Sequence, residues 1–470
     1  MKNKYFAATL MTVIYATSVY AQTPLPTPKL VVSIVIEQLR TDYLEKYAHL
    51  YGTNGFNKLL KEGIVYTTGT LPFYPADRAS AITSISTGTS PYYNGIVGVE
   101  WFNRNTLNST SCIKNEQSDF YLPSNITTST IGDELKIATE GMSVVYGIAE
   151  KAEAAILAAG HAADGAYWIG ADNLWHTSEY YGKKTPRWLD AYNKIGKSYI
   201  SGSNDRITEM ALQCLECNSM GKDDITDMLF VTYDAGANSN QNEKKNQSTQ
   251  SVYTGLDYTI GKLISNIENV VGCNNVLFVI SGTGYKEDES AIYGKYKIPS
   301  GTFYINRTSN LLNMYLGAIY GREQYIEACF YNQIYLNVRL IDQKRISMSD
   351  LLSRSQIFLM QNAGVQNVYT SESLLTSNDA KSEKIRNGFN VFNCGDIIIE
   401  TAPGWQLVNE DNNQRYISNI NFTPFPIIFY GTGKEPKFIE DPVTTDRIAP
   451  TISKKIQIRA PNACSSFPLF

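Results

Sequence analysis

The sequence contains very little histidine. His49, His161 and His176 are the only three in 470 residues, and none follows an apolar run typical of a strand. Catalytic zinc centres take most of their nitrogen ligands from histidine. The simpler interpretation of all three is a surface or helix-capping role.

The chain also lacks any concentration of basic residues. Lysine and arginine number 41 against 45 acidic residues, the net charge is −4, and the two signs are mixed along the sequence. Proteins that bind nucleic acid or an anionic membrane surface present a basic patch or run. We therefore expect no nucleic-acid partner.

Long apolar segments are absent except near the N-terminus. There, two lysines precede an apolar run from Tyr5 to Val19, and small residues follow up to Ala21. The run is shorter than the roughly 20 residues of a membrane-spanning helix, whereas this order of residues is typical of a secretory signal peptide. We predict a signal peptide over residues 1–21, export to the periplasm or the cell surface, and no membrane span after cleavage.

Cysteine is scarce and odd in number, so at least one of the seven is free. The closest pair is Cys214-Leu215-Glu216-Cys217, a spacing found in redox motifs and in zinc sites. No second pair of this kind and no neighbouring histidine accompanies it. The pair is therefore interpreted as a structural disulfide or as two buried thiols.

What the chain does contain is a set of short apolar runs, rich in β-branched residues and each ending at a polar residue or glycine. These runs are Leu30–Ile36, Met228–Tyr233, Val276–Ile280 and Pro426–Tyr430. They are typical of strands buried on both faces of a sheet, and helical segments such as 56–62 and 250–268 lie between them. The pattern predicts an α/β fold with a central, mostly parallel sheet flanked by helices on both faces.

Two regions mostly lack such runs and are rich in tyrosine and asparagine, about 100–199 and about 292–375. We predict that both are insertions that cap the sheet within a single domain, residues 22–470. Functional groups of such sheets gather at the carboxyl ends of the strands.

Several segments, taken in order, resemble one family. They include Gln38-Leu39-Arg40-Thr41-Asp42, Gly160-His161-Ala162-Ala163-Asp164, Asn387-Gly388-Phe389-Asn390 and Ile448-Ala449-Pro450-Thr451. The chain resembles the secreted, phosphate-irrepressible, zinc-dependent alkaline phosphatases of the alkaline phosphatase superfamily, which use a threonine nucleophile. The resemblance runs from residue 29 to near the C-terminus and implies that superfamily's fold.

The resemblance also implies two zinc ions, held chiefly by aspartate and histidine, which would activate the nucleophile and stabilise the leaving oxygen. Three of the implied ligand positions retain an oxygen donor: Glu37, Asp234 and Asn238. Three others have lost their ligand: Gly282, Thr283 and Pro424. The zinc site is therefore predicted to be lost.

The implied nucleophile position holds Arg78. A guanidinium neither attacks phosphorus nor binds a metal ion. Ser80 and Thr83 lie two and five residues further along, where we expect the start of a helix to point their hydroxyls elsewhere. No catalytic residue is therefore intact.

The phosphate-binding residues implied by the resemblance are also changed. Lys151 remains from a lysine-x-arginine clamp, but Glu153 stands in place of the arginine and Val99 in place of an asparagine. A carboxylate repels phosphate. We expect phosphate monoesters to bind poorly.

These observations predict an inactive, phosphatase-like protein that serves as a binding or scaffold protein of the cell envelope, with no cofactor and with a protein or a glycan as partner. In this interpretation Arg78 replaces the metal ions as the partner of Glu37 and Asp234. The alternative is a metal-dependent phosphatase or phosphodiesterase with an altered site, which holds zinc or magnesium through Glu37, Asp234 and Asn238. A third hypothesis, an ordinary phosphatase whose motifs are misaligned, conflicts with the shortage of histidine.

Overall fold

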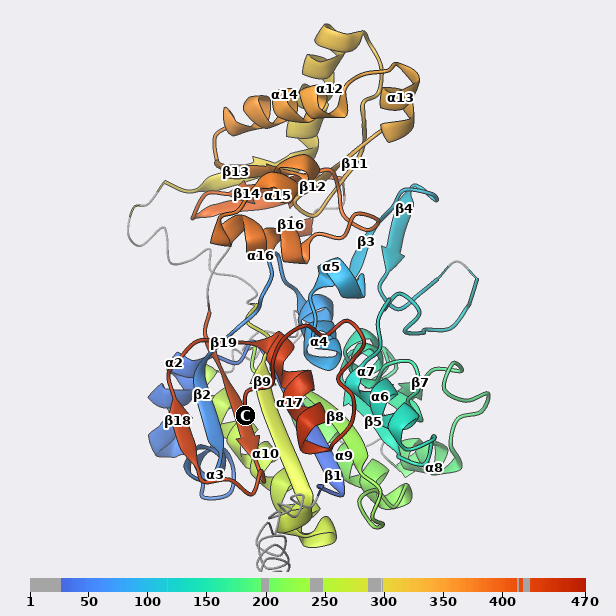
Figure 1. The fold of residues 1–470 in the computed structure, drawn as a ribbon, viewed down its shortest axis with the longest axis vertical. Coiled ribbons are helices and arrows are strands. Elements are labelled where there is room, and N and C mark those ends of the chain that lie inside the picture. Colours follow the sequence, from blue (N-terminus) through green and yellow to red (C-terminus); the bar gives the residue numbers. More distant parts are fainter. Residues whose placement is uncertain are drawn as a thin grey trace, which may run out of the picture.

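The computed structural model describes residues 27–115, 117–195, 203–236, 248–285, 297, 299–411, 414–416 and 423–470. The predicted signal peptide and Asn238 lie outside these residues. Two lobes are stacked along the long axis of the molecule. The lobe with the large central sheet lies below, and a smaller lobe lies above it (Figure 1).

The lower lobe is built on a ten-stranded sheet, in which most neighbouring strands are parallel. Its strands follow the order β18 (Lys437–Ile439), β2 (Ile64–Thr70), β17 (Phe425–Tyr430), β9 (Val276–Gly282), β1 (Leu30–Glu37), β8 (Asp227–Asp234), β5 (Val145–Ala149), β6 (Gly165–Ile169) and β7 (Trp175–Thr177), with β19 (Val443–Thr444) beside β2. The four strands expected from the sequence all lie in it.

Strand β1 is buried along its whole length because both faces of the sheet are covered. Its even-numbered residues from Leu30 to Ile36 pack into one hydrophobic core, whereas Val31 and Val35 pack into another. This alternation follows from the two-residue period of a strand. It explains why the run is apolar on both faces except at the small, buried Ser33.

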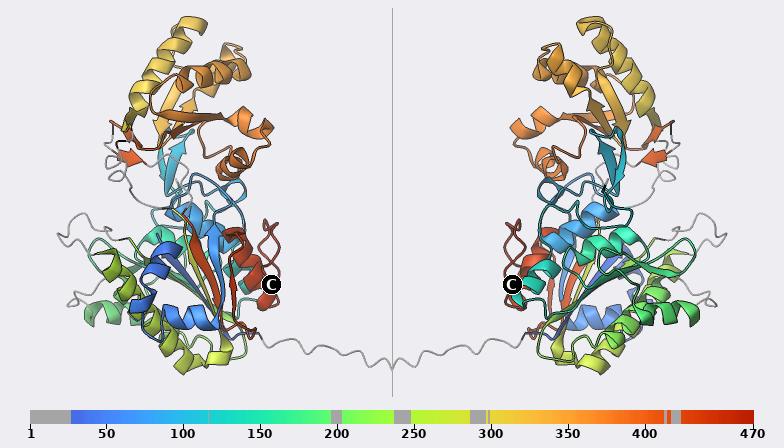
Figure 2. Two further views of the ribbon diagram at one scale, coloured as in Figure 1. Left: turned by 90° about the vertical axis from the view of Figure 1, so that its left-hand side faces the viewer. Right: turned by 90° about the vertical axis from the view of Figure 1, so that its right-hand side faces the viewer.

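Helices on the two faces supply these cores, and Figure 2 shows them on both sides of the sheet. The first core includes α3 (Phe56–Glu62), α9 (Ser203–Cys217) and α10 (Thr249–Val271). The second includes α4 (Arg78–Thr87), α6 (Ile131–Ala138), α7 (Ala152–Ala159) and α17 (Ile448–Lys455). The predicted mostly parallel α/β sheet flanked by helices is confirmed.

The upper lobe has its own hydrophobic core and two small sheets. Its strands are β10 (Gly301–Tyr304), β15 (Trp405–Asn409) and β16 (Gln414–Tyr416) in one sheet, and β11 (Ile326–Phe330), β12 (Gln333–Leu336), β14 (Ile397–Thr401) and β13 (Val365–Thr370) in the other. Its helices are α12 (Ile305–Tyr320), α13 (Val338–Gln343), α14 (Met348–Met360), α15 (Ser371–Thr376) and α16 (Ala380–Gly388).

Further elements lie along the chain between those already described. They are α2 (Thr41–Lys46), α5 (Pro91–Asn94), α8 (Arg187–Ile195) and the hairpin of β3 (Glu100–Asn103) and β4 (Asn108–Ser111). The Arg104 guanidinium, beside β3, donates to the Cys394 carbonyl and the Asp396 carboxylate at 3.2 and 2.9 Å, and so fastens the hairpin to the upper lobe.

The predicted insertion at 100–199 is wrong for its second half, because β5, β6 and β7 are strands of the main sheet. These strands are short, and β5 reads Val-Tyr-Gly-Ile-Ala, which lacks the continuous β-branched run used as the signal. The second predicted insertion, 292–375, is too short, since strands of the upper lobe continue to Tyr416.

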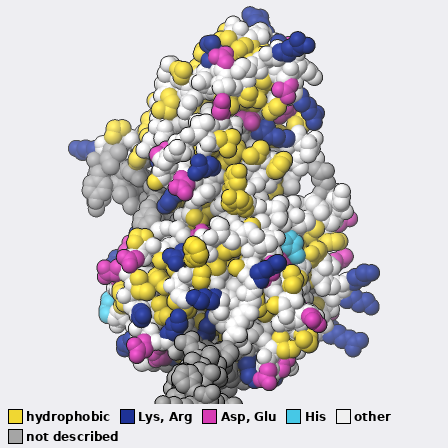
Figure 3. All heavy atoms as spheres, viewed as in Figure 1, with side chains coloured by type: hydrophobic (Ala, Val, Ile, Leu, Met, Phe, Trp, Pro, Cys, Tyr) yellow, Lys and Arg dark blue, Asp and Glu magenta, His cyan; other side chains and the backbone are white. Residues whose placement is uncertain are grey.

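All seven cysteines are free. Cys214 is buried, but Cys217 is exposed, so neither the disulfide nor the pair of buried thiols expected from the sequence is correct. Within the described residues, no helix has the length and apolar character to cross a membrane. Charges of both signs are scattered over the face shown in Figure 3, in keeping with the balanced composition.

Candidate functional site

The carboxyl ends of four neighbouring strands meet at one place on the sheet. Glu37, the last residue of β1, is in register with Asp234, the last residue of β8. On the other side of β1, Ile36 is in register with Gly282 at the end of β9. Glu150 directly follows β5, which pairs with β8. The topology therefore gathers residues from four distant parts of the sequence.

Arg78 reaches this place because α4 begins there. The Asp77 carboxylate accepts the Ser80 backbone N–H at 3.0 Å, and the Ser80 hydroxyl in turn accepts the Asp77 N–H at 3.0 Å. This reciprocal cap fixes the first turn of the helix. The second Asp77 oxygen accepts the N–H of Val99 at 2.6 Å and ties the cap to the following loop.

The two hydroxyls nearest to Arg78 are used within the helix. Ser80 belongs to the cap, and the Thr83 hydroxyl donates to the Ala79 carbonyl at 2.8 Å. Both side chains are buried. The expectation that neither points into the site is confirmed.

The Arg78 guanidinium binds two carboxylates. Its Nε lies 2.6 Å from Glu37 Oε2, and its Nη1 lies 3.0 Å from Glu153 Oε1. The side chains of Glu37, Glu153 and Arg78 are only 5, 16 and 19 % exposed. Charge-assisted hydrogen bonds of this kind are among the stronger polar contacts of a protein. Of the two partners predicted for Arg78, Glu37 is thereby confirmed, whereas the bond from Nη1 goes to Glu153, which the prediction did not include.

Tyr285, three residues after β9, completes this cluster by donating its hydroxyl hydrogen to Glu37 Oε2. Burial raises the pKa of Glu37 to about 7, with Arg78 opposing the shift and Asp234 adding to it. Burial alone would lower the pKa of Arg78, but the Glu37 carboxylate overrides it and raises that pKa. The guanidinium is a permanent cation in this place.

Asp234 is held by a different set of contacts. Its Oδ1 accepts the Gly236 N–H at 2.7 Å and the Gln38 side-chain amide at 3.2 Å. Its backbone N–H and carbonyl both bond to the side chain of Asn204 on α9. The carboxylate is thus fixed beside Glu37 at the ends of the two strands.

The β9 side of the site is filled by an aromatic ring. Phe425, at the start of β17, is fully buried. A Cβ atom at Gly282 would lie 2.6 Å from the Phe425 Cβ, and one at Gly284 would lie 2.7 Å from its Cε1. Real Cβ atoms do not approach so closely, so any side chain at Gly282 would displace the ring.

The other two positions at which the sequence analysis expected a lost ligand, Thr283 and Pro424, make hydrogen bonds that hold the backbone. The buried Thr283 hydroxyl accepts the N–H of Gln38 at 3.2 Å, and the Pro424 carbonyl accepts the N–H of Thr41 at 3.1 Å. Gln38 has a positive φ of 59°, a conformation that non-glycine residues seldom adopt. These contacts hold the turn that leaves β1.

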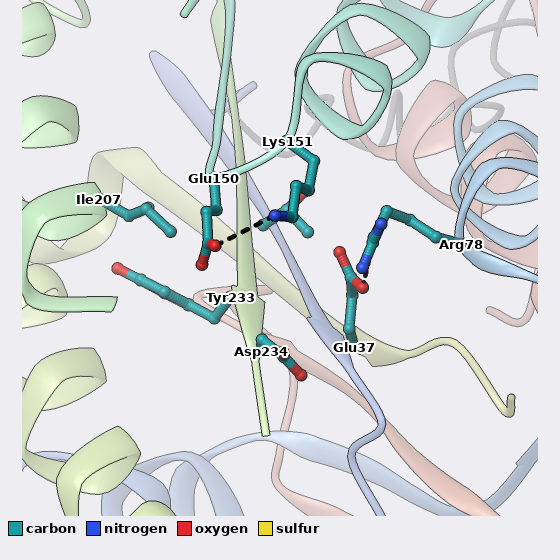
Figure 4. Close-up of a pocket in the computed structure, with 8 residues that line it drawn as sticks. Glu37, Arg78, Glu150, Lys151, Ile207, Tyr233 and Asp234 are labelled. Atoms are coloured by element: carbon teal, nitrogen blue, oxygen red, sulfur yellow. Dashed lines mark hydrogen bonds and ion pairs between the residues drawn. The ribbon is translucent and has the colours of Figure 1, made fainter. Parts of the chain in front are cut away.

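On the opposite side of β1, a pocket of about 200 Å³ remains (Figure 4). Its lining residues are Glu37, Arg78, Glu150, Lys151, Ile207, Thr232, Tyr233 and Asp234. Lys151 Nζ lies 3.4 Å from Glu150 Oε1, and the lysine side chain is 48 % exposed. The structure therefore brings together Glu37, Arg78, Lys151 and Asp234, as the sequence suggested.

The residues present do not fit a two-zinc centre. Within the described residues, no group of three or more histidine, cysteine, aspartate or glutamate side chains is arranged to hold a metal ion. Asn238, the remaining donor expected from the sequence, lies outside them. Arg78 places a fixed positive charge against Glu37, and Phe425 fills the space beside Gly282.

The histidines lie elsewhere. His161 contacts Asp133 and the Ile126 carbonyl, and His176 contacts Asp172, four residues earlier. Three residues of the site were missed by the sequence analysis: Glu150, Tyr285 and Phe425. A polar residue directly after a strand was the available signal for Glu150, but β5 itself was not recognised.

The sheet order, the flanking helices and the capping lobe define an alkaline-phosphatase-like α/β protein. The model of the family described as type I phosphodiesterase / nucleotide pyrophosphatase matches residues 31–423, and the chain belongs to that family.

Among known relatives, the chain is 25 % identical over 515 residues to alkaline phosphatase PafA of Elizabethkingia meningoseptica, covering 94 % of each chain. It is 26 % identical over 543 residues to a protein of Myroides odoratus named calcium-transporting ATPase, covering 100 % of this chain and 99 % of the relative. The crystal structure of wild-type PafA superposes with a TM-score of 0.84 at 24 % identity, covering 94 % of this chain and 98 % of that one. The last comparison supports the fold.

Proposed function

We propose that this protein is a catalytically inactive member of its family that acts as a binding or scaffold protein of the cell envelope. The observation that carries the proposal is the pairing of Arg78 with Glu37 and Glu153. By the resemblance, Arg78 stands at the position of the nucleophile, and Glu153 stands at the position of a phosphate-binding arginine. Both positions carry substitutions, and the two new side chains bind one another.

This exchange removes three requirements of phosphoryl transfer at once. No hydroxyl stands at the nucleophile position, the guanidinium of the clamp is replaced by a carboxylate, and a fixed cation occupies the neighbourhood of Glu37. Phe425 adds a fourth obstacle, because its ring occupies the space in which a ligand at Gly282 would have to lie.

A second candidate function, a metal-dependent phosphoric ester hydrolase with an altered site, is supported by the activity in the name of the Elizabethkingia relative. In this chain the donors left to it are the Glu37 and Asp234 carboxylates and Asn238. An all-oxygen set of this kind suits magnesium better than zinc.

The deciding experiment measures metal content and hydrolysis on the same preparation. The full-length chain is purified without chelators or added metal and analysed by inductively coupled plasma mass spectrometry. It is then assayed with 4-nitrophenyl phosphate and bis(4-nitrophenyl) phosphate, each with and without added zinc or magnesium. The Elizabethkingia PafA enzyme, purified in parallel, is the positive control.

We expect substoichiometric metal and no hydrolysis of either substrate. Stoichiometric metal with turnover that is lost in Asp234→Asn would overturn the proposal in favour of the hydrolase. Turnover that is unchanged in Asp234→Asn would identify a contaminating phosphatase.

The location and the partner belong to the same proposal. The order of residues 1–21, with lysines, an apolar run and small residues, supports export to the periplasm or the cell surface. A protein or a glycan of the cell envelope is the partner that this location offers. Size-exclusion chromatography of the native protein with light scattering would show whether it is isolated as part of a complex.

A further inference from the structure

The lower lobe carries a local concentration of positive charge around α8. Residues 179–194 contain four cations and two carboxylates, a net charge of +2, which leaves −6 for the rest of a chain whose total is −4. The cations are Lys183, Lys184, Arg187 and Lys194, and all four are exposed. Figure 3 shows lysine and arginine side chains projecting from the edge of the lower lobe at which Figure 1 places α8. This segment is an exception to the mixing of charges along the chain as a whole.

None of the four cations is used by the fold in an ion pair. Within the part of the chain that the structure describes, no carboxylate pairs with any of them. Other lysines of the lower lobe do form such pairs, as Lys58 does with Glu268 at 2.6 Å. The charge of the α8 cations is therefore free to act on a partner.

The stability of α8 does not explain where these charges lie. Lys183 and Lys184 come shortly before the helix, and Arg187 is its first residue. The N-terminal end of a helix carries a partial positive charge, so cations there are disfavoured. Asp190 is the one acidic residue of the first turn. The arrangement costs helix stability, and we therefore look for its role in binding.

The spacing of the cations suits an extended anion better than a compact one. Arg187 and Lys194 are seven residues apart, which is close to two full turns, so they lie on the same side of α8 and about 10 Å apart along its axis. A single phosphate ion cannot contact both. A polymer that carries an anionic group on successive units can pair with several of these cations at once.

The apolar side chains that would insert into a lipid bilayer are already used inside the fold. Amphipathic helices that bind membranes expose large apolar residues opposite their lysines. In α8, Leu189 is buried in the core and Trp188 packs against Tyr167. Tyr180 is the one large hydrophobic residue of 179–194 that is exposed. These contacts favour a polymer over a membrane surface.

We propose that the basic surface around α8, formed by Lys183, Lys184, Arg187 and Lys194, binds an anionic polysaccharide of the cell envelope. The inference rests on the proposed function, because it names the class of partner of that binding protein. None of the four residues lines the strand-end pocket, so the two surfaces are separate. Carboxylate or phosphate groups on successive sugar units accept charge-assisted hydrogen bonds from the cations.

Isothermal titration calorimetry on the full-length chain, in a buffer free of divalent cations, tests the proposal with three probes. They are polygalacturonate, which carries a carboxylate on each sugar, neutral dextran, and vesicles of equal parts phosphatidylglycerol and phosphatidylcholine. We expect polygalacturonate to bind, its affinity to fall as salt is added, and dextran to give no measurable heat. Compared per anionic group, the vesicles should bind at least about tenfold more weakly than polygalacturonate.

A triple variant locates the surface. Lys183→Gln, Lys184→Gln and Arg187→Gln, combined in one chain, should weaken polygalacturonate binding by at least about tenfold. The dependence of the remaining affinity on salt should become less steep, because fewer counterions are exchanged. Thermal unfolding establishes that the variant is folded. The salt dependence of wild type needs no substitution and tests the electrostatic part independently.

The matched control removes three positive charges from exposed positions elsewhere. It combines Lys61→Gln, Lys222→Gln and Lys437→Gln. Its net charge equals that of the first variant, so a general effect of charge would weaken both equally. We expect the control to change the affinity by less than about twofold.

No binding of polygalacturonate, equal binding of dextran, an equal loss in both triple variants, or tighter binding of the vesicles would each overturn the proposal. The last outcome would assign the surface to a membrane. Failure here is distinguishable from failure of the proposed function. A metal-free, inactive protein that ignores polygalacturonate loses only this partner class, whereas metal-dependent hydrolysis removes the proposed function whatever the polysaccharide does.

Discussion

The two sides of the strand-end site are held by different physical means. On the β9 side, the ring of Phe425 packs closely against Gly282 and Gly284. On the β1, β8 and β5 side, acidic residues stand at the strand ends, and the Arg78 side chain supplies a positive charge next to Glu37 and Glu153. One side is thus stabilised by filling volume, and the other by balancing charge.

The packed side and the charge-balanced side differ in the space that they leave for a ligand. A side filled by packing has no room for a ligand, and a larger side chain at Gly282 requires the ring of Phe425 to move. A side balanced by an ion pair keeps its polar atoms and its space, here a pocket of about 200 Å³. Substitutions on the two sides should therefore differ in size and in kind.

The largest effect is expected at Phe425. Replacing a fully buried phenylalanine by alanine removes its contacts and leaves a cavity, which costs about 3–5 kcal/mol, and Phe425 has no exposed surface. Chemical unfolding of Phe425→Ala measures the loss. Phe438→Ala is the matched control, since Phe438 is 60 % exposed. A loss at Phe425 no larger than at Phe438 would show that the β9 side is not held by packing.

The next effect is expected at Arg78. Removing one partner of a buried ion pair leaves an uncompensated charge and costs about 3 kcal/mol, so Arg78→Ala should lower the unfolding free energy by about that amount. Arg78→Lys should cost less because it keeps the charge, but a lysine cannot present the guanidinium fork to two carboxylates. If alanine and lysine cost the same, the charge is not what stabilises this side.

Gly282→Ala should cost about 1–3 kcal/mol, the usual range for an extra methyl in a packed core, because its Cβ would lie 2.6 Å from that of Phe425. Gly255→Ala provides the opposite control. Gly255 lies within α10 with no atom near the position of a Cβ, so alanine there should be neutral or stabilising by helix propensity. Equal effects at the two glycines would contradict the tight packing inferred for the β9 side.

The same contrast explains what the sequence could reveal. Strands β1, β8 and β9 were recognisable because burial on both faces leaves a continuous apolar run, and helix α3 begins and ends where the sequence placed it. The pairing of Arg78 with Glu37 was predictable because a cation and a carboxylate stand at adjoining positions of a resembled site. The charge of a side chain follows directly from its residue type.

The packing of side chains that are distant in the sequence cannot be predicted from residue type. That Phe425 fills the space beside Gly282 depends on two strands 143 positions apart lying side by side with a particular register. Tyr285 was missed for the same reason, since its hydroxyl reaches Glu37 only through the turn after β9. Strands β5 to β7 were missed because they are short, and Tyr, Gly, Ala and Trp interrupt their few β-branched residues.

The smallest predicted effect concerns the ion pair between His161 and Asp133, which lies outside the strand-end pocket. It tests whether an ion pair elsewhere in the fold also stabilises the protein through its charge. His161 Nδ1 lies 2.9 Å from Asp133 Oδ2, and its Nε2 lies 3.1 Å from the Ile126 carbonyl. Both partners are acceptors, so only the doubly protonated ring satisfies both. The hydrogen bond to Asp133 raises the pKa of His161 above its usual value.

A raised histidine pKa stabilises the fold fully below its unfolded value of about 6.5 and stops doing so as the pH rises through the folded pKa. The unfolding free energy of wild type should therefore exceed that of His161→Asn by on the order of 1 kcal/mol at pH 5.5, and this difference should shrink as the pH is raised above 7. Arg78→Ala should show the opposite trend, with a deficit that grows as the pH rises through about 7, because burial raises the pKa of Glu37 to about 7 and its carboxylate then ionises without its cation. A pH-independent deficit in His161→Asn would mean that its contacts act by packing, and the division between charge and packing drawn at the strand ends would then not extend to the rest of the fold.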